Sequence, residues 1–460
     1  KYHRPRGIYT CGIEEPNALV QILNEHNEPN VRATVKKIYD GMIVKSQNRW
    51  PSLKRDFGSI NNLLSPIFSA GFYYKTFMGP KSFWKNVYEP LIRRTAGLGK
   101  PPREFKSKSI HLHHNVDVLI VGGGLAGLLA AKKLAGTDQD VLLIERDNYL
   151  GGILKNSNKI KSIDGQQSND WIEKTEWLLK SANNITILKN TTVTTYNYKD
   201  HLIAIEDKSV GTPPDNSKPE LVMHKIRTKH TVLANGHIER FLSFRNNDLP
   251  GVMLAASFEK YIHKYGVVAD SSPVIFTNNS STFSLLKTMV DMNHKPKAYV
   301  DIRDPKKIEK ETLELINKYN IPFYPKSEIE GCEGKNQIEK IFIRTKKDKT
   351  LKIKTSMLCI SGGLNPDIHL FTQSKGLVKW DEKILTFKPE KSFQNTITLG
   401  SVSGNFHFEK LVEDINKKLG FIEGCNNIST NIEVLGPKEF YIKEIWETKN
   451  LKKSLWSKSF

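Results

Sequence analysis

Two short apolar runs frame the most informative part of the chain. Residues 116–121 (VDVLIV) and 140–145 (DVLLIE) are almost continuously apolar, which is typical of strands buried on both faces of a parallel sheet. Between them, residues 128–134 (LLAAKKL) repeat apolar positions at the helical period. The order strand, helix, strand predicts a βαβ unit.

The pattern continues with a helix at 168–182, a strand at 185–189 and two strands of a meander at 201–207 and 221–234, the last two joined by the loop 211–219. A second strand, helix and strand follow within 273–303 and end at Asp301. Further strands are expected near 322, at 339–343, within 356–366 and in a returning segment, 396–404. The chain is therefore predicted to be an α/β protein with two Rossmann-like units.

The first 110 residues differ from the rest, because they are rich in aromatic residues, Pro and Arg and show little periodicity. Residues 1–22 predict two short strands around a turn at Pro5 to Gly7. A dense aromatic stretch has two interpretations: the core of a loop-rich domain, or a surface that covers a neighbouring subunit or cofactor. Its members are Phe72, Tyr73, Tyr74, Phe77, Phe83, Trp84 and Tyr88.

Glycines stand between the first predicted strand and helix. Gly122, Gly124 and Gly127 have G-x-G-x-x-G spacing, in which the first permits a tight turn, the second lets a pyrophosphate approach and the third lets helix and strand pack closely. Glu145 ends the second strand about 20 residues later, where an acceptor for a ribose 2′-hydroxyl belongs. Its charge disfavours a 2′-phosphate, although the adjacent Arg146 leaves NADP open.

The second strand–helix repeat lacks these glycines. Asn278, Asn279 and Ser280 occupy the equivalent turn, so a close approach of a pyrophosphate is not expected. We predict a degenerate second nucleotide domain whose role is mainly structural.

Composition narrows the function classes. The formal net charge is +20, but the basic residues are spread along the chain and interleaved with acids, which disfavours nucleic acid as a partner. Cys11, Cys332, Cys359 and Cys425 form no C-x-x-C pair, which excludes a metal or redox site built from local cysteine pairs. The sequence shows neither a signal peptide nor an apolar run of membrane-spanning length, so a cytoplasmic protein is expected.

Histidines offer little catalytic chemistry. His111, His113 and His114 have no acidic or cysteine partner nearby in sequence, so no metal site is predicted. His237 and Glu239 follow a second predicted cofactor turn, and we expect them to anchor that turn rather than to transfer protons. No catalytic residue is assigned.

Several ordered segments together resemble the α subunit of heterotetrameric sarcosine oxidase and the related proline dehydrogenase and opine oxidase subunits. They are KYHRPRGI (1–8), GIEEPNALV (12–20), the GGGLAG turn, LLIERDNYLGG (142–152), ANGHIERFLSFRNNDLPGVML (234–254), FTNNSS (276–281) and SGGLNPDIHLFTQSKGLVKWDE (361–382).

The resemblance implies a pair of dinucleotide-binding domains of the disulfide-reductase type, one inserted in the other, after the remnant of a ferredoxin-like domain. The expected division is 1–110 for the N-terminal region, 111–250 with 385–430 for the NAD-binding domain, 251–384 for the degenerate domain and 431–460 for a linker. The chain begins with Lys1 and is expected to be a fragment, with a folate-binding domain missing beyond residue 460.

The resemblance also implies the cofactors and partners. NAD occupies the first site, with FAD or ATP as alternatives in the same pocket. FMN lies at the interface with a β subunit that carries FAD and oxidises the amine, tetrahydrofolate binds the missing domain, and small γ and δ subunits complete the complex. The expected cofactor-binding residues are Gly122, Gly124, Leu125, Ala126, Gly127, Glu145, Arg146, Gly152, Ile153, Val193, Ala234, Asn235, Gly236, Gly400, Ser401 and Phe406.

Three functions remain open from the sequence. The first is the nucleotide-binding α subunit of a flavin-dependent sarcosine oxidase, which converts sarcosine to glycine with methylene transfer to tetrahydrofolate and reduction of oxygen to peroxide. The second is an autonomous FAD/NAD(P)H-dependent oxidoreductase. The third is a non-catalytic scaffold subunit.

Overall fold

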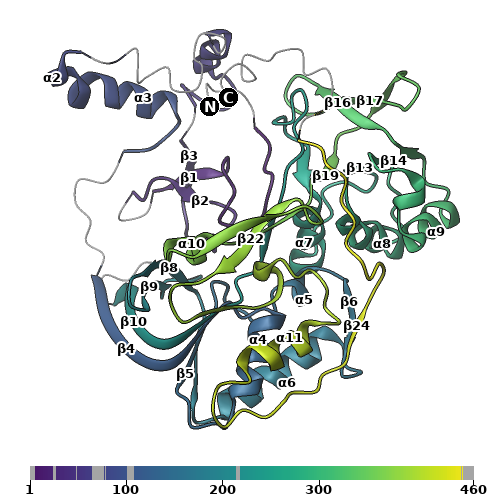
Figure 1. The fold of residues 1–460 in the computed structure, drawn as a ribbon. Helices are drawn as coiled ribbons and strands as arrows, with labels where there is room; N and C mark the ends of the chain where they lie inside the picture. Colours follow the sequence, from purple (N-terminus) through teal and green to yellow (C-terminus); the bar gives the residue numbers. More distant parts are fainter. Residues whose placement is uncertain are drawn as a thin grey trace.

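The computed structural model describes residues 6–23, 27–47, 49–64, 77, 79–100, 108–213, 218–446 and 448. Figure 1 shows two α/β units, with N-terminal segments beside them. The N-terminal part contains β1 (Leu19–Ile22), β2 (Val31–Arg32) and β3 (Val44–Ser46), in the order β2-β1-β3. They are followed by η1 (Phe57–Leu64), α2 (Lys81–Phe83), η2 (Trp84–Tyr88) and α3 (Glu89–Thr95).

The larger sheet has the strand order β7-β5-β4-β10-β9-β8, and β23 also pairs with β10. Its parallel part contains the first predicted βαβ unit. The bounds are β4 (Lys108–Val121), α4 (Leu125–Leu134), β5 (Val141–Ile144), α5 (Ile153–Asn156), β6 (Ile160–Ile163), α6 (Ser168–Ser181), β7 (Ile185–Leu188), β8 (Thr191–Asn197), β9 (His201–Asp207), β10 (Pro219–Leu233), β11 (His237–Glu239) and β23 (Thr396–Thr398).

The smaller parallel sheet has the order β12-β19-β13-β14-β15, beside an antiparallel sheet β16-β17-β18. Its bounds are β12 (Val252–Leu254), α7 (Ala255–Tyr265), β13 (Val274–Thr277), η3 (Ser280–Thr282), α8 (Phe283–Asp291), β14 (Ala298–Asp301), η4 (Pro305–Lys307), α9 (Lys310–Lys318), β15 (Phe323–Pro325), β16 (Glu328–Glu333), β17 (Lys340–Arg344), β18 (Thr350–Lys354) and β19 (Leu358–Ser361).

The last elements return to the first unit. They are β20 (Leu364–Pro366), α10 (His369–Gln373), β21 (Leu377–Asp381), β22 (Thr386–Lys391), η5 (Gly400–Ser403), α11 (Leu411–Leu419) and β24 (Ile432–Val434). Strand β20 pairs with β11, and β24 pairs with β6. The pairing of Thr396 with Thr231 confirms the predicted returning strand.

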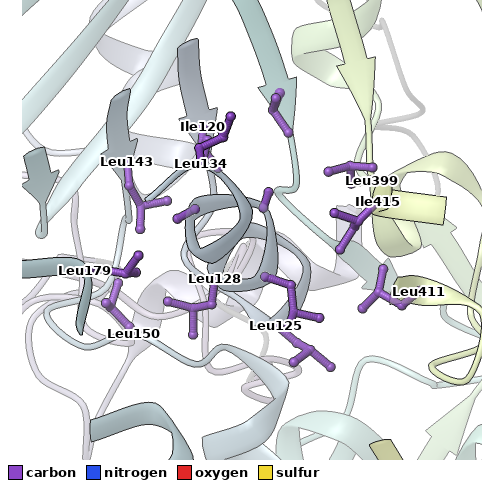
Figure 2. Packing of buried hydrophobic residues seen from close by; sticks show 14 of the residues in the cluster. Ile120, Leu125, Leu128, Leu134, Leu143, Leu150, Leu179, Leu399, Leu411 and Ile415 are labelled. Carbon is purple, nitrogen blue, oxygen red and sulfur yellow. The ribbon is translucent and has the colours of Figure 1, made fainter. Parts of the chain in front are cut away.

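Both faces of β4 and β5 are covered by apolar side chains, as the sequence pattern predicts. Val118 and Ile120 point into a core with helices α4, α6 and α11, which Figure 2 shows around Leu128. Leu119 and Val121 belong to a second core that includes β8, β9 and α10. Residues that alternate along one strand therefore hold two separate layers together.

Strand β4 is longer than predicted. It begins at Lys108 rather than Val116, because it pairs in parallel with β10 as far as Lys108 opposite Pro219. Residues 108–113 are exposed, so the backbone ladder extends the strand where no apolar pattern marks it.

Two expected segment boundaries differ from the observed pairing. The boundary at 384/385 falls in the turn of the β21–β22 hairpin, because the two strands pair with each other. Within the expected linker, Ile432 pairs with Ile163, and Ile442 forms a bridge with Asn279. Both pairings are made by backbone hydrogen bonds, which the pattern of polar and apolar residues does not reveal.

The aromatic stretch is only partly described, since Phe72, Tyr73 and Tyr74 lie outside the described residues. Phe83 and Trp84 are exposed, at 47% and 46% of their surface, and Tyr88 packs on the Phe83 ring. Neither α2 nor η2 buries a residue. Phe83 and Trp84 therefore do not belong to a domain core, whereas Phe77 and Tyr88 are half-buried.

Gly127 controls how closely α4 approaches the turn after β4. A Cβ atom at Gly127 would lie 1.8 Å from the carbonyl oxygen of Gly122, whereas one at Gly124 would meet nothing within 4 Å. We expect Gly127→Ala to lower the free energy of unfolding by about 2–4 kcal/mol.

Urea denaturation measures this loss, and Gly124→Ala is the matched control. The control changes stability by no more than about 1 kcal/mol, the usual cost of alanine at a helix N-cap. Equal stability of the two variants would contradict the packing role of Gly127.

Candidate functional site

A cavity of about 700 Å³ lies at the carboxyl end of the parallel strands of the larger sheet. Its lining comes from the turn after β4, the end of β5, the turn at Ala234 to Gly236, and the segment around Gly400. The carboxyl end of a parallel sheet is where α/β proteins bind ligands. Segments more than 100 residues apart in sequence thus meet at one site.

The structure places the predicted cofactor-binding residues around this cavity, with one exception. Gly127 lies behind the turn, in the contact between α4 and Gly122. The predicted residues that line the cavity are Gly122, Gly124, Leu125, Ala126, Glu145, Arg146, Gly152, Ile153, Val193, Ala234, Asn235, Gly236, Gly400, Ser401 and Phe406.

The glycine turn opens the N-terminal end of α4 to the cavity. Gly122 has φ of +106°, and a Cβ there would lie 2.5 Å from the Ala234 carbonyl oxygen. Gly124 is the N-cap of α4 and provides no side-chain cap. Because the unpaired N–H groups and the dipole of a helix N-terminus favour anions, this geometry suits a phosphate group.

Glu145 is held rigidly beside the turn. Its carboxylate accepts hydrogen bonds from the N–H groups of Gly123, at 2.7 Å, and Asp147, at 2.8 Å. Burial raises the pKa of Glu145, and these backbone donors oppose the rise. Arg146 is exposed next to it. The acid both supports the turn and presents an acceptor to the cavity.

Asn235 has an incomplete set of hydrogen bonds. Its Nδ2 donates to the carbonyl oxygen of Asp367 at 2.7 Å, whereas its Oδ1 is buried without a partner among the described residues. A buried acceptor without a donor is costly. Since Asn235 lines the cavity, a ligand with a donor group would satisfy this oxygen.

A polar cluster, made of Lys159, His237, Glu239 and Glu259, lines another part of the cavity. Glu239 accepts a hydrogen bond from the Ala256 N–H in the first turn of α7, at 2.8 Å, and His237 Nδ1 lies 3.0 Å from Ser401 Oγ. These bonds agree with anchoring of the turn. The cluster also places charges of both signs beside the cavity.

Burial changes the protonation of this cluster. It lowers the pKa of His237 to about 3, with a further contribution from the Lys159 charge, and it raises the pKa of Glu239 to about 7. It also lowers the pKa of Lys159, against the opposing charges of Glu259 and Glu239. His237 is therefore neutral near pH 7, and the pKa of Glu239 lies close to that pH.

Several lining residues were not predicted. Cys11, Ile13 and Glu14 come from the N-terminal segment, Ser281 and Ser284 from the second unit, and Pro437 to Phe440 from the C-terminal segment. Cys11 Sγ lies 3.8 Å from the Ser257 carbonyl oxygen, which ties the N-terminal segment to α7. No local motif identifies these residues, because only the packing of distant segments brings them together.

The histidine run lies away from the cavity, on β4. His114 Nε2 is 2.9 Å from His224 Nδ1, and His224 Nε2 is 3.1 Å from Glu206 Oε2. His114 thus has a partner that only the strand pairing reveals. The described ranges contain no group of three or more His, Cys, Asp and Glu side chains that could hold a metal ion. None of the helices described is long and apolar enough to cross a membrane.

The fold and the nucleotide cradle define a class of protein. Residues 116–388, more than half of the chain, match the pyridine nucleotide-disulphide oxidoreductase family, and this chain belongs to that family. Residues 1–49 match a 2Fe-2S iron-sulfur cluster binding domain. These matches confirm the predicted Rossmann-like fold and the ferredoxin-like N-terminal remnant.

Individual relatives indicate a narrower group within this family. Sarcosine oxidase subunit alpha of Rhizobium meliloti (strain 1021) is 34% identical over 419 residues, which cover 88% of this chain and 40% of the relative. The subunit of the same name from Corynebacterium sp. (strain P-1) is 28% identical over 417 residues, covering 88% of this chain and 38% of its own. The predicted resemblance is confirmed, and this chain spans about two fifths of the length of these relatives.

Among solved structures, L-proline dehydrogenase from P. horikoshii is 20% identical, with a TM-score of 0.47, and covers 70% of this chain and 58% of its own.

Residues 1–49 match an iron–sulfur domain but lack the ligands for a cluster. A 2Fe–2S cluster of this type needs four cysteine ligands, or two with two histidines, and residues 1–49 contain one cysteine, Cys11. Cys11 is buried against Ser257, and burial raises the pKa of its thiol. The residues present in this stretch do not fit the group.

The raised pKa of Glu239 predicts a pH dependence of stability. Between about pH 4.5 and 7 the folded chain keeps a proton on Glu239 that the unfolded chain has lost. The stabilising contribution is thus complete below the unfolded pKa and is lost as the pH rises through 7. In Glu239→Gln this titration is absent.

We compare the free energy of unfolding of the wild type with that of Glu239→Gln. The difference should fall by on the order of 1 kcal/mol between pH 5 and 8, a value that allows for screening by water in the cavity. Urea denaturation at several pH values measures the difference. Two curves that stay parallel over this range would show that Glu239 titrates normally.

Proposed function

We propose that this chain is the nucleotide-binding part of the α subunit of a flavin-dependent sarcosine oxidase complex. The complex oxidises the N-methyl group of sarcosine, a secondary amine, yields glycine, transfers the methylene group to tetrahydrofolate and reduces oxygen to peroxide. Sequence identity of 34% to a sarcosine oxidase subunit alpha supports this assignment.

The observation that carries the nucleotide role is the open cradle at Gly124. The space at the Gly124 Cα, the N-terminus of α4 and the Oδ1 of Asn235 face the same cavity, and this oxygen has no partner in the part of the chain that the structure describes. Together they match a ligand with a pyrophosphate and additional hydrogen-bond donors. The residues present therefore fit a dinucleotide.

NAD is the dinucleotide that the charges favour. Glu145 stands at the end of β5, where a ribose hydroxyl donates to a carboxylate, and a 2′-phosphate there would meet a like charge. FAD and ATP share the adenosine and phosphate features and remain the alternatives. Bound NAD could supply hydride transfer, but the residues described here hold and orient it.

The oxidation itself is assigned to a partner. Near the cradle, His237 pairs with Ser401 and Glu239 accepts a backbone N–H, and we assign both contacts to anchoring of the turn. The proposal therefore places amine oxidation in a β subunit that carries FAD. FMN at the interface, tetrahydrofolate, and the γ and δ subunits enter only through the resemblance.

Two measurements test this proposal. Calorimetry of the purified chain should show that NADH binds at least about tenfold more tightly than NADPH, because the Glu145 carboxylate repels the extra phosphate. Gly124→Val should weaken NADH at least about tenfold by filling the cradle, and Gly124→Ala should weaken it less.

Co-purification tests the wider role. The intact complex should contain a second, flavin-bearing subunit and, on denaturation, release NAD into solution, where mass spectrometry identifies it. A chain that binds no dinucleotide and captures no flavoprotein would refute the proposal. Tight flavin absorbance in the isolated chain, bleached by NADH, would instead favour an autonomous oxidoreductase.

A further inference from the structure

The second Rossmann-like unit has its own ligand-binding edge, at the turn after β13. In such units a dinucleotide lies against the turn that follows the first strand. Here that turn is Asn278 to Ser280, and its side chains are buried. Another part of the chain covers it: residues 436–446, which we call the strap. Figure 1 shows the strap in yellow, running from β24 past β13 and β19.

The strap pairs with the turn through its backbone. The Ser280 N–H donates to the Tyr441 carbonyl oxygen at 3.0 Å, and the Lys443 N–H donates to the Asn278 carbonyl oxygen at 2.9 Å. Asn278 Nδ2 donates to the Lys443 carbonyl oxygen at 2.8 Å, and the Tyr441 N–H donates to Ser280 Oγ at 2.8 Å. The strap thus uses the polar groups that a phosphate would need.

The positive side chain at this edge, Arg303, is already paired with carboxylates of the protein. Arg303 follows β14, where a basic residue would meet a nucleotide phosphate, but it is 2% exposed. Its guanidinium donates to Asp301 and Glu309, each at 2.8 Å. The carboxylates neutralise the charge inside the protein, so Arg303 does not attract an anion.

The same strap borders the first cavity. Pro437, Lys438, Glu439 and Phe440 line it, the Phe440 ring lies 5.3 Å from the Phe406 ring, and His407 Nδ1 lies 2.8 Å from the Lys438 carbonyl oxygen. One continuous segment therefore contacts both units.

Side chains hold the far end of the strap. Ile445 packs on the core of the second unit, and the Trp446 ring lies 5.0 Å from the Arg240 guanidinium and 5.9 Å from the Trp380 ring. Arg240 is itself fixed by the carbonyl oxygens of Gly362 and Leu385. The strap is anchored beyond the turn that it covers.

We propose that the strap acts as an internal peptide ligand of the second unit, so that this chain holds a single dinucleotide, in the first cavity, and releases it only when the strap detaches. The part of this inference that concerns the first cavity rests on the proposed NAD site. The filling of the second groove stands without it.

Lys443→Pro tests the inference in the full chain, because proline removes the N–H that donates to Asn278. Lys443→Ala is the matched control, since it removes the side-chain contact with the Ile302 carbonyl oxygen but keeps the backbone donor. Hydrogen exchange at the Ser280 amide reports strap detachment, and stopped-flow fluorescence reports NADH release.

In the wild type we expect one NADH per chain. In Lys443→Pro we expect exchange at Ser280 and release of NADH to be at least about tenfold faster. Lys443→Ala should change both rates by less than about threefold. A chain that ends at Leu435 provides a second way to remove the strap.

Faster exchange at Ser280 with unchanged NADH release would overturn the role of the strap at the first cavity. Two NADH molecules per wild-type chain, or unchanged exchange at Ser280 in both the proline variant and the shortened chain, would overturn the filling of the second groove. Absence of NADH binding in the wild type would refute the proposed function, while the exchange at Ser280 would still report on the groove.

Discussion

The contact between α4 and the turn after β4 is the constraint on which the rest of the structure depends. Gly127 lets the helix approach the Gly122 carbonyl oxygen more closely than any side chain allows. This approach aligns the N-terminus of α4 with the cavity and buries Leu128 and Leu134 between the sheet and α11. The same contact therefore serves both the packing and the anion-binding end of the helix.

The cavity combines this rigid cradle with a polar region of a different kind. Glu145 is restrained by two backbone N–H groups, whereas the Oδ1 of Asn235 has no hydrogen-bond partner among the described residues. Farther along the lining, burial keeps His237 neutral and brings the pKa of Glu239 to about 7. Such an arrangement is suited to holding a ligand in one orientation.

The two Rossmann-like units differ at the same structural position, the turn after the first strand. In the first, glycines leave room at the turn after the first strand. In the second, Asn279 fills the turn and caps η3 by accepting from the Ser281 N–H, and the backbone of residues 441–443 pairs with it. Loss of the glycines and occupation of the groove are consistent with each other, because both satisfy polar groups without a ligand.

The sequence by itself determined the central βαβ unit, because apolar runs buried on both faces and glycines with a steric role leave a local pattern at Val116–Gly127 and Glu145. It also determined the family, through ordered matches along most of the chain. Only the tertiary structure decided the extension of β4 to Lys108, the His114–His224 contact, the polar cluster at Lys159 and the path of the strap. These depend on backbone pairing and on contacts between distant segments, which follow from the packing of the whole chain.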